Sequence, residues 1–368
     1  MNSAAKLLGQ ANKVTSLKTA IRSAVKSVAR VELFEAIAIK AAESAGKARS
    51  SKAAVAKPED FDVDAVYLWV DDQDPAWQAR RAKYAPSRQS DSSSVSASRF
   101  RQFGELAASI QMLAEHAPFI RNVFIVVDQQ QPDLSALPAN LPFEIRLVNH
   151  SEFIPAEYLP TYSSRAITAN LHRIEGLAER FLYCNDDVFI AKPASASDWF
   201  TSQGVRLRYT STPMPERGSL APDEVIYNAR YKTIDLATAH GWSNVDGMPE
   251  HGPHPFLKSI MRELWRDFVV EMNGVSTAKF RTADGLLPEW LHNLAAFGTG
   301  RGELVTGSGY KYIAINDQNS LPAIIHMLLN RGRILTVCLN DVSEVAEGSK
   351  LSDAKLARRF KRVLKAMV

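Results

Sequence analysis

Residues 159–193 read LPTYSSRAITANLHRIEGLAERFLYCNDDVFIAKP, a pattern that combines a helix with a buried strand. In the first half, apolar residues recur with the 3.6-residue period of one helix face: Ile167, Leu171, Ile174, Leu177 and Ala178. An apolar run at 181–184 then has strand character, and residues 188–190 resume it. We therefore expect a loop, an amphipathic helix and a strand that is interrupted at 185–187.

The interruption consists of Asn185, Asp186 and Asp187. Two adjacent carboxylates between apolar strand segments are unfavourable unless a cation neutralises them. A Mg²⁺ ion that carries a nucleotide diphosphate would do so. A solvated acidic turn is the alternative.

Length and composition indicate one large domain with extensions. The chain has 368 residues, of which 46% are hydrophobic, so it can bury a large core. Cys184 and Cys338 stand in apolar runs, which suits reduced core thiols of a cytoplasmic protein and predicts no thiolate metal site. No apolar run reaches the ~18 residues of a membrane span, and the start of the chain lacks the apolar segment of a secretory signal.

The two ends of the chain are basic. Residues 1–57 hold eleven Lys or Arg and three Glu, a net charge of +8 in a chain whose total is +4. The body is therefore neutral to acidic, which argues against a nucleic-acid-binding core. We expect a basic amphipathic helix and linker at 1–57, the main domain at 58–345 and a second basic amphipathic helix at 346–368. The ends could bind an anionic membrane, at the inner face of a bacterial membrane, or pack between subunits of a homo-oligomer.

Carboxylates follow the expected strands of the first half. Asp71 and Asp72 come after an apolar strand in the segment 62–77, and Asp128 ends the next one. The order of strands and helices predicts an α/β fold with a mostly parallel central sheet. Ligands bind at the carboxyl ends of the strands in such sheets. Arg99 and Arg101, just ahead of an expected helix, are candidates for phosphate contacts.

The second half offers weaker signals. His251 and His254 precede an expected helix whose apolar face starts at Phe256, and they could hold a metal or transfer a proton. We expect irregular loops at 199–231. The Gly-rich residues 298–309 lack a Gly-Lys-Ser/Thr ending, so they predict a flexible loop and not a nucleotide P-loop.

Taken in order, these segments resemble the conserved regions of the Stealth family. The segments are DAVYLWVDDQDPAW, SRFRQFGELAASIQMLAEHAPFIRNVFIVVDQQQP, residues 159–193, HGPHP with the later KFR, and AINDQ. The family comprises hexose-1-phosphate transferases of bacterial capsule synthesis and of lysosomal-enzyme tagging in animals. The resemblance covers roughly residues 62–320.

The resemblance implies a fold and a reaction. It implies a nucleotide-sugar transferase core of the GT-A kind that uses Mg²⁺ or Mn²⁺ and a UDP-sugar donor. Such an enzyme moves the sugar-1-phosphate, here expected to be N-acetylhexosamine-1-phosphate, to a hydroxyl of a growing capsular polysaccharide and releases UMP. An ordinary metal-dependent glycosyltransferase that releases UDP is the alternative.

The resemblance also implies roles for individual residues. Asp187 would be the essential carboxylate and a metal ligand, His251 a catalytic imidazole and Arg281 a phosphate-binding cation. Asp71, Asp72 and Arg99 would contact the nucleotide, whereas Asn316, Asp317 and Gln318 would contact the metal or the pyrophosphate. Further candidate substrate contacts beside these motifs are Arg101, Asp128, His172, Asn185 and Lys279.

One position departs from the family pattern. Where the family has Phe-Asn-Ser-x-Ala-Ile-Glu, this chain has Tyr162 to Thr168, so that Thr168 stands in place of a glutamate thought to act at the site. Either His251 or Asp187 takes over the role of base, or the site is impaired. An impaired site would suit a membrane-associated protein of capsule assembly.

Overall fold

A five-stranded sheet forms the centre of the computed structural model, which describes residues 31–47, 60–85, 101–305, 309–342, 345 and 347–368. Its strands, in spatial order, are β3 (Glu144–Asn149), β2 (Ile120–Val127), β1 (Val63–Leu68), β4 (Arg180–Asn185) and β8 (His254–Leu257). All neighbours are parallel except β8, which runs antiparallel to β4 at the edge. The predicted α/β class with a mostly parallel central sheet is therefore confirmed.

The register of β1 and β4 brings their carboxyl ends together. Val63 pairs with Arg180 at one end and Leu68 with Asn185 at the other. Chain order reverses beside β1, because β2 and β3 extend the sheet on one side and β4 on the other. Open α/β sheets bind ligands beside such a reversal, and acidic residues follow both strands there.

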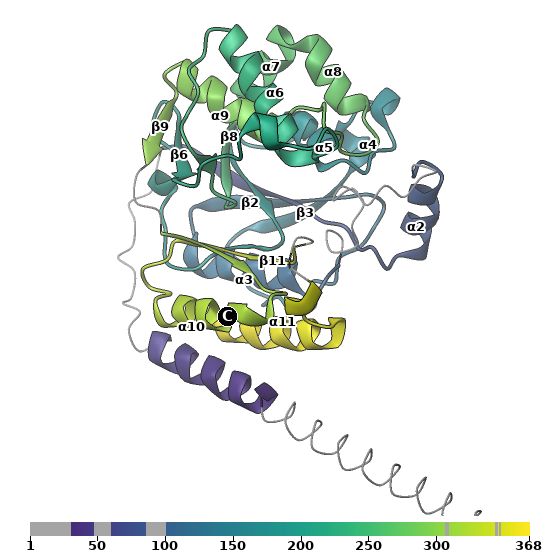
Figure 1. Cartoon of the computed structure of the whole chain (residues 1–368). Coiled ribbons are helices and arrows are strands. Elements are labelled where there is room, and N and C mark those ends of the chain that lie inside the picture. Colours follow the sequence, from purple (N-terminus) through teal and green to yellow (C-terminus); the bar gives the residue numbers. More distant parts are fainter. Residues whose placement is uncertain (1–30, 48–59, 86–100, 306–308, 343–344, 346) are drawn as a thin grey trace, which may run out of the picture.

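Helices cover the sheet on both sides (Figure 1). Helices α5 to α9 lie on one side, whereas α3, α10 and α11 lie on the other. The helices are α2 (Pro75–Ala82), α3 (Glu105–His116), α4 (His150–Phe153), α5 (Ser164–Asn170), α6 (Val225–Ala239), α7 (Lys258–Asp267), α8 (Val269–Thr277), α9 (Pro288–Gly298), α10 (Leu321–Leu329) and α11 (Asp353–Met367). In the described part of the chain, no helix is both long enough and apolar enough to span a membrane.

Two small sheets extend this core. One has the order β10 (Tyr310–Ala314), β11 (Thr336–Asn340), β5 (Val188–Ile190), and the other the order β7 (Met248–Pro249), β6 (Val205–Thr210), β9 (Gly302–Val305). Helix α3 lies between the central sheet and the β10-β11-β5 sheet. Its Leu106 and Ile110 belong to the main core, whereas Met112 packs into a second core with β5, β11 and α11.

The buried Arg359 of α11 joins three distant parts of the chain. Its guanidinium makes two 3.0 Å contacts with the carboxylate of Glu35, on the helix formed by residues 31–47. It also donates to the carbonyl of Asp317 (2.7 Å) and to Ser320 Oγ (3.0 Å), beside α10. Both helices therefore pack on the body, and the domain boundaries at 57/58 and 345/346 stay predictions.

Four segments differ from their expected structure. The helix in 159–193 ends at Asn170 and continues only as a 3₁₀ turn, Leu171–Arg173. Residues 254–257 form β8 and not the start of a helix, because their backbone pairs with β4 and the helix begins at Lys258. The expected loop at 199–231 contains β6 and the start of α6, and the expected loop at 298–309 contains β9. The two strands form because β6 and β9 pair in parallel.

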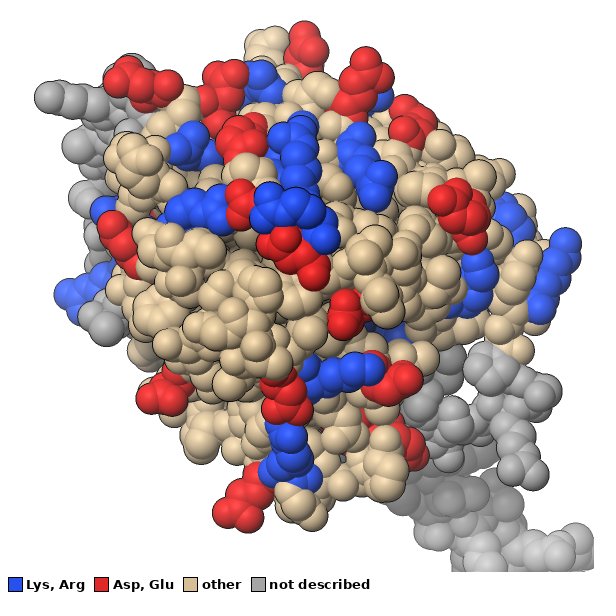
Figure 2. Space-filling model, turned by 90° about the horizontal axis from the view of Figure 1, so that it is seen from above, with Lys and Arg blue, Asp and Glu red and all other residues tan. Residues whose placement is uncertain are grey.

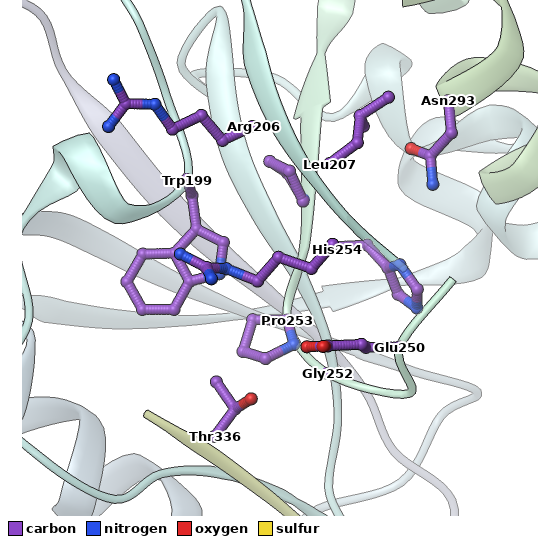
Figure 3. Close-up of a pocket in the computed structure, with 11 residues that line it drawn as sticks. Trp199, Arg206, Leu207, Glu250, Gly252, Pro253, His254, Asn293 and Thr336 are labelled. Atoms are coloured by element: carbon purple, nitrogen blue, oxygen red, sulfur yellow. The ribbon is translucent and has the colours of Figure 1, made fainter. Parts of the chain in front are cut away.

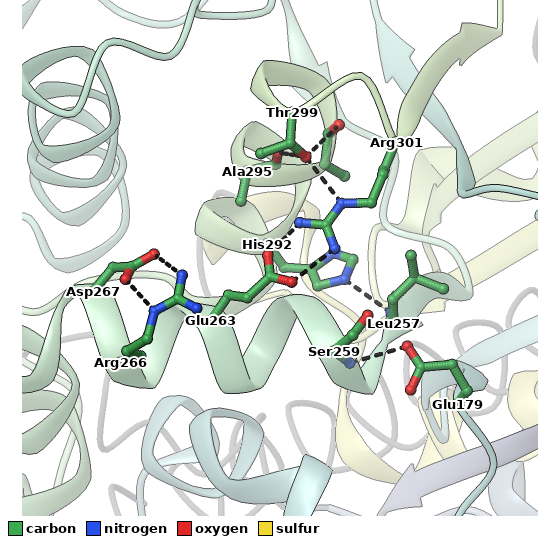
Figure 4. A network of polar contacts seen from close by, with 11 residues as sticks. Glu179, Leu257, Ser259, Glu263, Arg266, Asp267, His292, Ala295, Thr299 and Arg301 are labelled. Carbon is green, nitrogen blue, oxygen red and sulfur yellow. Dashed lines mark hydrogen bonds and ion pairs between the residues drawn. The ribbon is translucent and has the colours of Figure 1, made fainter.

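His292 connects α9 to strand β8 (Figure 4). Its Nε2 accepts a 2.9 Å hydrogen bond from the backbone N–H of Leu257, and its ring stacks on Phe256 with centroids 4.4 Å apart. Burial lowers the pKa of His292 to about 3, so the ring is neutral and its acceptor lone pair is available. Helix α7 is held alongside through the ion pair of Glu263 with Arg301.

We expect His292→Gln to weaken the pH dependence of the free energy of unfolding between about pH 7 and pH 5. The unfolded chain takes up a proton at this histidine below about pH 6.5, whereas the folded protein does so only near pH 3. The stabilisation that neutral His292 contributes to the folded protein is therefore complete above the unfolded pKa. As the pH falls below that pKa, the free energy of unfolding decreases by at most about 1.4 kcal/mol per pH unit.

Urea unfolding at both pH values measures this effect. His326→Gln is the matched control, because His326 is exposed on α10. A slope for His292→Gln equal to that of the parent protein would contradict the interpretation.

Candidate active site

Asp186 and Asp187 form the turn between β4 and β5, at the carboxyl end of β4. Gln102 links this turn to the end of β1, since Trp69 Nε1 donates to Gln102 Oε1 (2.9 Å) and Gln102 Nε2 donates to Asp186 Oδ2 (2.8 Å). Burial, and then repulsion from Asp187, raise the pKa of Asp186 to about 6. Two carboxylates in this position favour the approach of a cation.

Asp187 faces His251, which lies on the segment before β8. His251 Nε2 is 3.8 Å from Asp187 Oδ1 and 3.1 Å from Asn185 Nδ2. The Tyr183 hydroxyl donates to Asn185 Oδ1 (3.1 Å), so the amide of Asn185 turns its N–H toward the imidazole. His251 Nε2 is therefore the acceptor in its contact with Asn185.

Cys338 of β11 completes a group of metal-capable atoms. The ligand atoms of Asp187, His251 and Cys338 all lie within 4.8 Å of one another. Asp187 Oδ1 is buried without a hydrogen-bond partner in the described part of the chain, as expected of an oxygen that a cation would satisfy. The carboxylate and the imidazole therefore fit a divalent cation.

The thiol of Cys338 is a weaker candidate ligand. Burial raises the pKa of Cys338 well above its ordinary value, and its Sγ donates to Asp187 Oδ2 at 3.4 Å. The group is therefore a neutral thiol that orients the carboxylate. The prediction of a free, buried Cys338 is confirmed, but its position beside Asp187 was not expected.

Glu105 adds a third carboxyl group near the turn. Burial, and then the charge of Asp186, raise the pKa of Glu105 to about 8. Glu105 is therefore neutral at pH 7, and it accepts the backbone N–H of Phe103 at the start of α3. The carboxylate that Asp187 offers to a cation thus gains no further charged neighbour from α3.

Arg281 approaches the same site from the other side of Tyr183. It donates to Ser164 Oγ at the start of α5, and burial lowers its pKa. Arg165, beside it, donates to the carbonyls of Thr282 (2.7 Å) and Val225 (2.8 Å). Burial, and then the charge of Arg281, lower the pKa of Arg165 to about 10. The charge of Glu289 reaches both arginines, but no ion pair with a carboxylate is described for either of them. Two cations held this close favour an anionic ligand.

Thr168 is buried in α5 on the side that faces Tyr183. Its hydroxyl lies within hydrogen-bonding reach of the Tyr183 phenol. The charges of Arg281 and Asp187 also affect the pKa of this phenol. The position that departs from the family pattern thus lies between the arginine and the acidic turn.

The turn after β1 lies next to Arg101. Burial raises the pKa of Asp72, and the charge of Arg101 opposes this effect. Arg101 forms 2.6 Å ion pairs with Asp341 and Asp353, so its own charge is already balanced. Asp71 accepts the backbone N–H of Gln73. Arg99 lies outside the described residues.

Three other candidates have contacts of their own. Asp128, at the end of β2, pairs with Arg80 at 3.2 Å. Lys279 donates to the carbonyl of Tyr158 (3.1 Å). His172 is buried against Trp265, and burial lowers its pKa to about 3. The contacts described for these residues do not join them to Asp187.

Asn316, Asp317 and Gln318 bind the C-terminal part of the chain. Asn316 Nδ2 donates to the carbonyl of Val342 (2.7 Å), and Gln318 Nε2 to that of Gly348 (3.0 Å). Asp317 accepts the backbone N–H of Asn319 and so caps a 3₁₀ turn. Among the described residues, Asp317 is not part of the metal-capable group at Asp187. Asn316 Oδ1 is buried without a hydrogen-bond partner in the described part of the chain, and the role of this motif as a metal or pyrophosphate contact stays a prediction.

A polar pocket lies beside the His251 segment (Figure 3). Trp199 and Asn293 line it with His254, whose pKa burial lowers to about 3. Its lining comes from β6, β8, α9 and β11. The segment that carries His251 therefore forms one wall of this pocket.

Several site neighbours were not found from the sequence. Gln102 and Glu105 stand in a segment that resembles the family and Cys338 stands in an apolar run, but none of the three was predicted to reach the acidic turn. Tyr310 accepts the backbone N–H of His251 (3.2 Å), and it lies 59 residues farther along the chain. Only the pairing of the sheets brings these residues together.

Comparison with known families gives three matches along the chain. Conserved region 1 of the Stealth proteins matches residues 61–89, conserved region 2 matches residues 99–208, and conserved region 3 matches residues 250–293. These regions contain β1, the acidic turn and His251.

Curated bacterial proteins are similar over the same part. A capsular polysaccharide phosphotransferase of Actinobacillus pleuropneumoniae is 35% identical over 230 residues, which is 61% of this chain and 62% of the relative. An exopolysaccharide phosphotransferase of Streptomyces coelicolor is 33% identical over 308 residues, 82% of this chain and 32% of the relative. The chain thus spans about three fifths and one third of these proteins.

Solved glycosyltransferase structures are more distant. The galactosyltransferase LgtC, in complex with donor and acceptor sugar analogues, has a TM-score of 0.40 and 13% identity, over 82% of this chain and 95% of that chain. Mouse xyloside xylosyltransferase 1 has a TM-score of 0.39 and 10% identity, and the match covers 76% of this chain and 98% of the mouse chain. Nothing about a ligand follows from likeness at this level.

We expect Asp187→Asn to weaken binding of Mn²⁺ at least about tenfold, because the amide removes the charge that a cation requires. Asp317→Asn is the control, since asparagine can still cap the 3₁₀ turn. Cys338→Ser should also bind Mn²⁺ like the parent protein. Electron paramagnetic resonance of free Mn²⁺ gives the dissociation constant of Mn²⁺ for the parent protein and for each of the three variants. Equal losses in Asp187→Asn and Asp317→Asn would show that the last motif also holds the metal.

Proposed function

The chain belongs to the Stealth family, and we propose that it transfers a sugar-1-phosphate from a UDP-sugar to a hydroxyl of a growing capsular polysaccharide. The donor would be a UDP-N-acetylhexosamine, and the second product UMP. The names of the curated relatives support a phosphotransferase of polysaccharide synthesis. The contact between Asp187 and His251 at the carboxyl end of β4 carries the proposal, because it combines a cation site with a proton acceptor.

The proposed reaction forms one phosphodiester bond and breaks one phosphoanhydride bond. The acceptor hydroxyl attacks the phosphorus that bears the sugar, and the bond from this phosphorus to the bridging oxygen breaks. UMP leaves with that oxygen. The hydroxyl proton passes to a base, and the sugar stays attached to its phosphate. Charge neutralisation contributes more to such a transfer than covalent chemistry does.

In this proposal His251 is the base. Its Nε2 is an acceptor, since Asn185 presents an N–H to it, and its main chain is fixed by Tyr310. Asp187 lies 3.8 Å away and stabilises the imidazolium that forms. The turn between β4 and β5 positions Asp187, whereas Asn185 and Tyr310 hold His251 beside it.

Arg281 binds the phosphate in this proposal. Ser164 fixes its guanidinium, and Arg165 keeps a second positive charge nearby. Positive groups aimed at the transferred phosphoryl group stabilise the charge that develops in the transition state. Mg²⁺ or Mn²⁺ held by Asp187 would neutralise the pyrophosphate, which leaves His251 free to act as the base.

Incubation with UDP-N-acetylhexosamine, Mg²⁺ and a capsular oligosaccharide tests the reaction. We expect UMP in amounts equal to the phosphodiester formed. Asp187→Asn and Arg281→Gln should each lower kcat on the order of a hundredfold, whereas Lys192→Gln, outside the proposed site, should not. Release of UDP would identify an ordinary glycosyltransferase instead. An Asp187→Asn protein with full activity would refute the site.

Thr168→Glu tests whether the site lacks its base. Because we assign the base to His251, we expect the substitution to leave kcat unchanged or lower. A carboxylate at this buried position loses its hydration and crowds the Tyr183 hydroxyl. Thr168→Gln has the same size without the charge and is the control. A rise of more than about tenfold in Thr168→Glu alone would show that the natural chain carries an impaired site.

A further inference from the structure

The helix formed by residues 31–47 and helix α11 lie side by side on one side of the molecule (Figure 1). At the start of the helix formed by residues 31–47, Glu32 pairs with Arg358 of α11 at 2.7 Å. One turn later Glu35 pairs with the buried Arg359. Ile39 and Ala42 are buried in the second core, so the helix has one face fixed on the body.

The opposite face of this helix is apolar and exposed. Four large apolar side chains are between 59% and 65% exposed: Val31, Leu33, Phe34 and Ile37. The other exposed large apolar side chains in the described part of the chain are scattered as single residues or short pairs. Large apolar groups gathered on one exposed face mark a binding surface.

The neighbouring face of α11 is basic. Its outward side chains include Lys355, Arg358, Lys361, Arg362 and Lys365. The hydrogen bond from Arg358 lowers the pKa of Glu32, and the charges of Arg362 and Lys355 also reach this carboxylate. The cations of α11 thus lie beside the start of the apolar face. We call the two faces together the basal surface.

We propose that the basal surface binds an anionic lipid bilayer. The apolar side chains of the helix 31–47 would enter the boundary between headgroups and acyl chains, and the cations of α11 would contact anionic headgroups. This inference does not rest on the proposed reaction. It selects one of the two roles that the basic ends left open.

Charge complementarity favours lipid over the other occupants. A second copy that docked through the same surface would bring the cations of two α11 helices together, which is unfavourable. A soluble polyanion would pair with the cations but would leave Leu33, Phe34 and Ile37 exposed to water. On the side of α6 to α9, acidic and basic side chains alternate and no single sign prevails (Figure 2).

Sedimentation of the full chain with phosphatidylcholine vesicles, with and without phosphatidylglycerol, tests the proposal. We expect binding only with phosphatidylglycerol, and weaker binding at high salt. Leu33→Ser/Phe34→Ser/Ile37→Ser should weaken binding at least tenfold. The control is Val269→Ser/Val270→Ser, which removes two exposed apolar groups from α8. Lys361→Gln/Lys365→Gln should also weaken binding, whereas Lys83→Gln/Lys192→Gln should not.

Thermal melting shows that each variant is folded, and nucleotide release measured without vesicles separates this proposal from the proposed reaction. Failure of the parent chain to bind anionic vesicles would overturn the proposal. So would full binding by the triple serine variant. If that variant instead dissociates a dimer of the parent chain, the occupant is a second copy. If polyphosphate binds equally well to the parent chain and to the triple variant and vesicles do not bind, the occupant is a soluble polyanion.

Discussion

Repulsion between Asp186 and Asp187 governs the arrangement of the candidate active site. The two carboxylates adjoin each other where β4 ends, and they differ in their hydrogen-bond contacts. Gln102 donates to Asp186 and connects it to Trp69, so this carboxylate holds the ends of β1 and β4 together. Asp187 keeps one buried oxygen without a partner among the described contacts. One carboxylate thus supports the site, and the other remains available for a cation.

Much of the central sheet could be predicted from the sequence, because its strands are apolar runs that end in carboxylates. Strands β1, β2 and β4 follow this pattern, and parallel pairing then necessarily gathers their acidic ends. Strand β8 does not follow it. Its four residues are too short for a periodic signal, and their strand conformation comes from pairing with β4. Strand β9 is likewise specified by its partner β6 and not by its own glycine-rich sequence.

The site was predictable where a motif carries both the chemistry and the position. Asp187 and His251, to which the resemblance assigns roles at one site, lie 3.8 Å apart although 64 residues separate them in the sequence, and their roles stay predictions. Cys338 was recognised as a buried thiol, but its contact with Asp187 depends on the antiparallel pairing of β11 with β5. For Asn316, Asp317 and Gln318, the motif did not predict the contacts that the structure describes. Their motif is recognisable, yet their described contacts are with the C-terminal segment.

The cluster around Arg359 also has a consequence for the order in which the chain is assembled. Glu35 and Arg359 are 324 residues apart. At a synthesis rate of about 5–20 residues per second, Glu35 waits roughly 15–65 seconds on the ribosome before Arg359 exists. During that time Ile39 and Ala42 have no α11 to pack against, and they rely on other contacts or remain in water. Helix α11 therefore fixes the helix formed by residues 31–47 in place, and this part of the fold can form only after Arg359 has been synthesised.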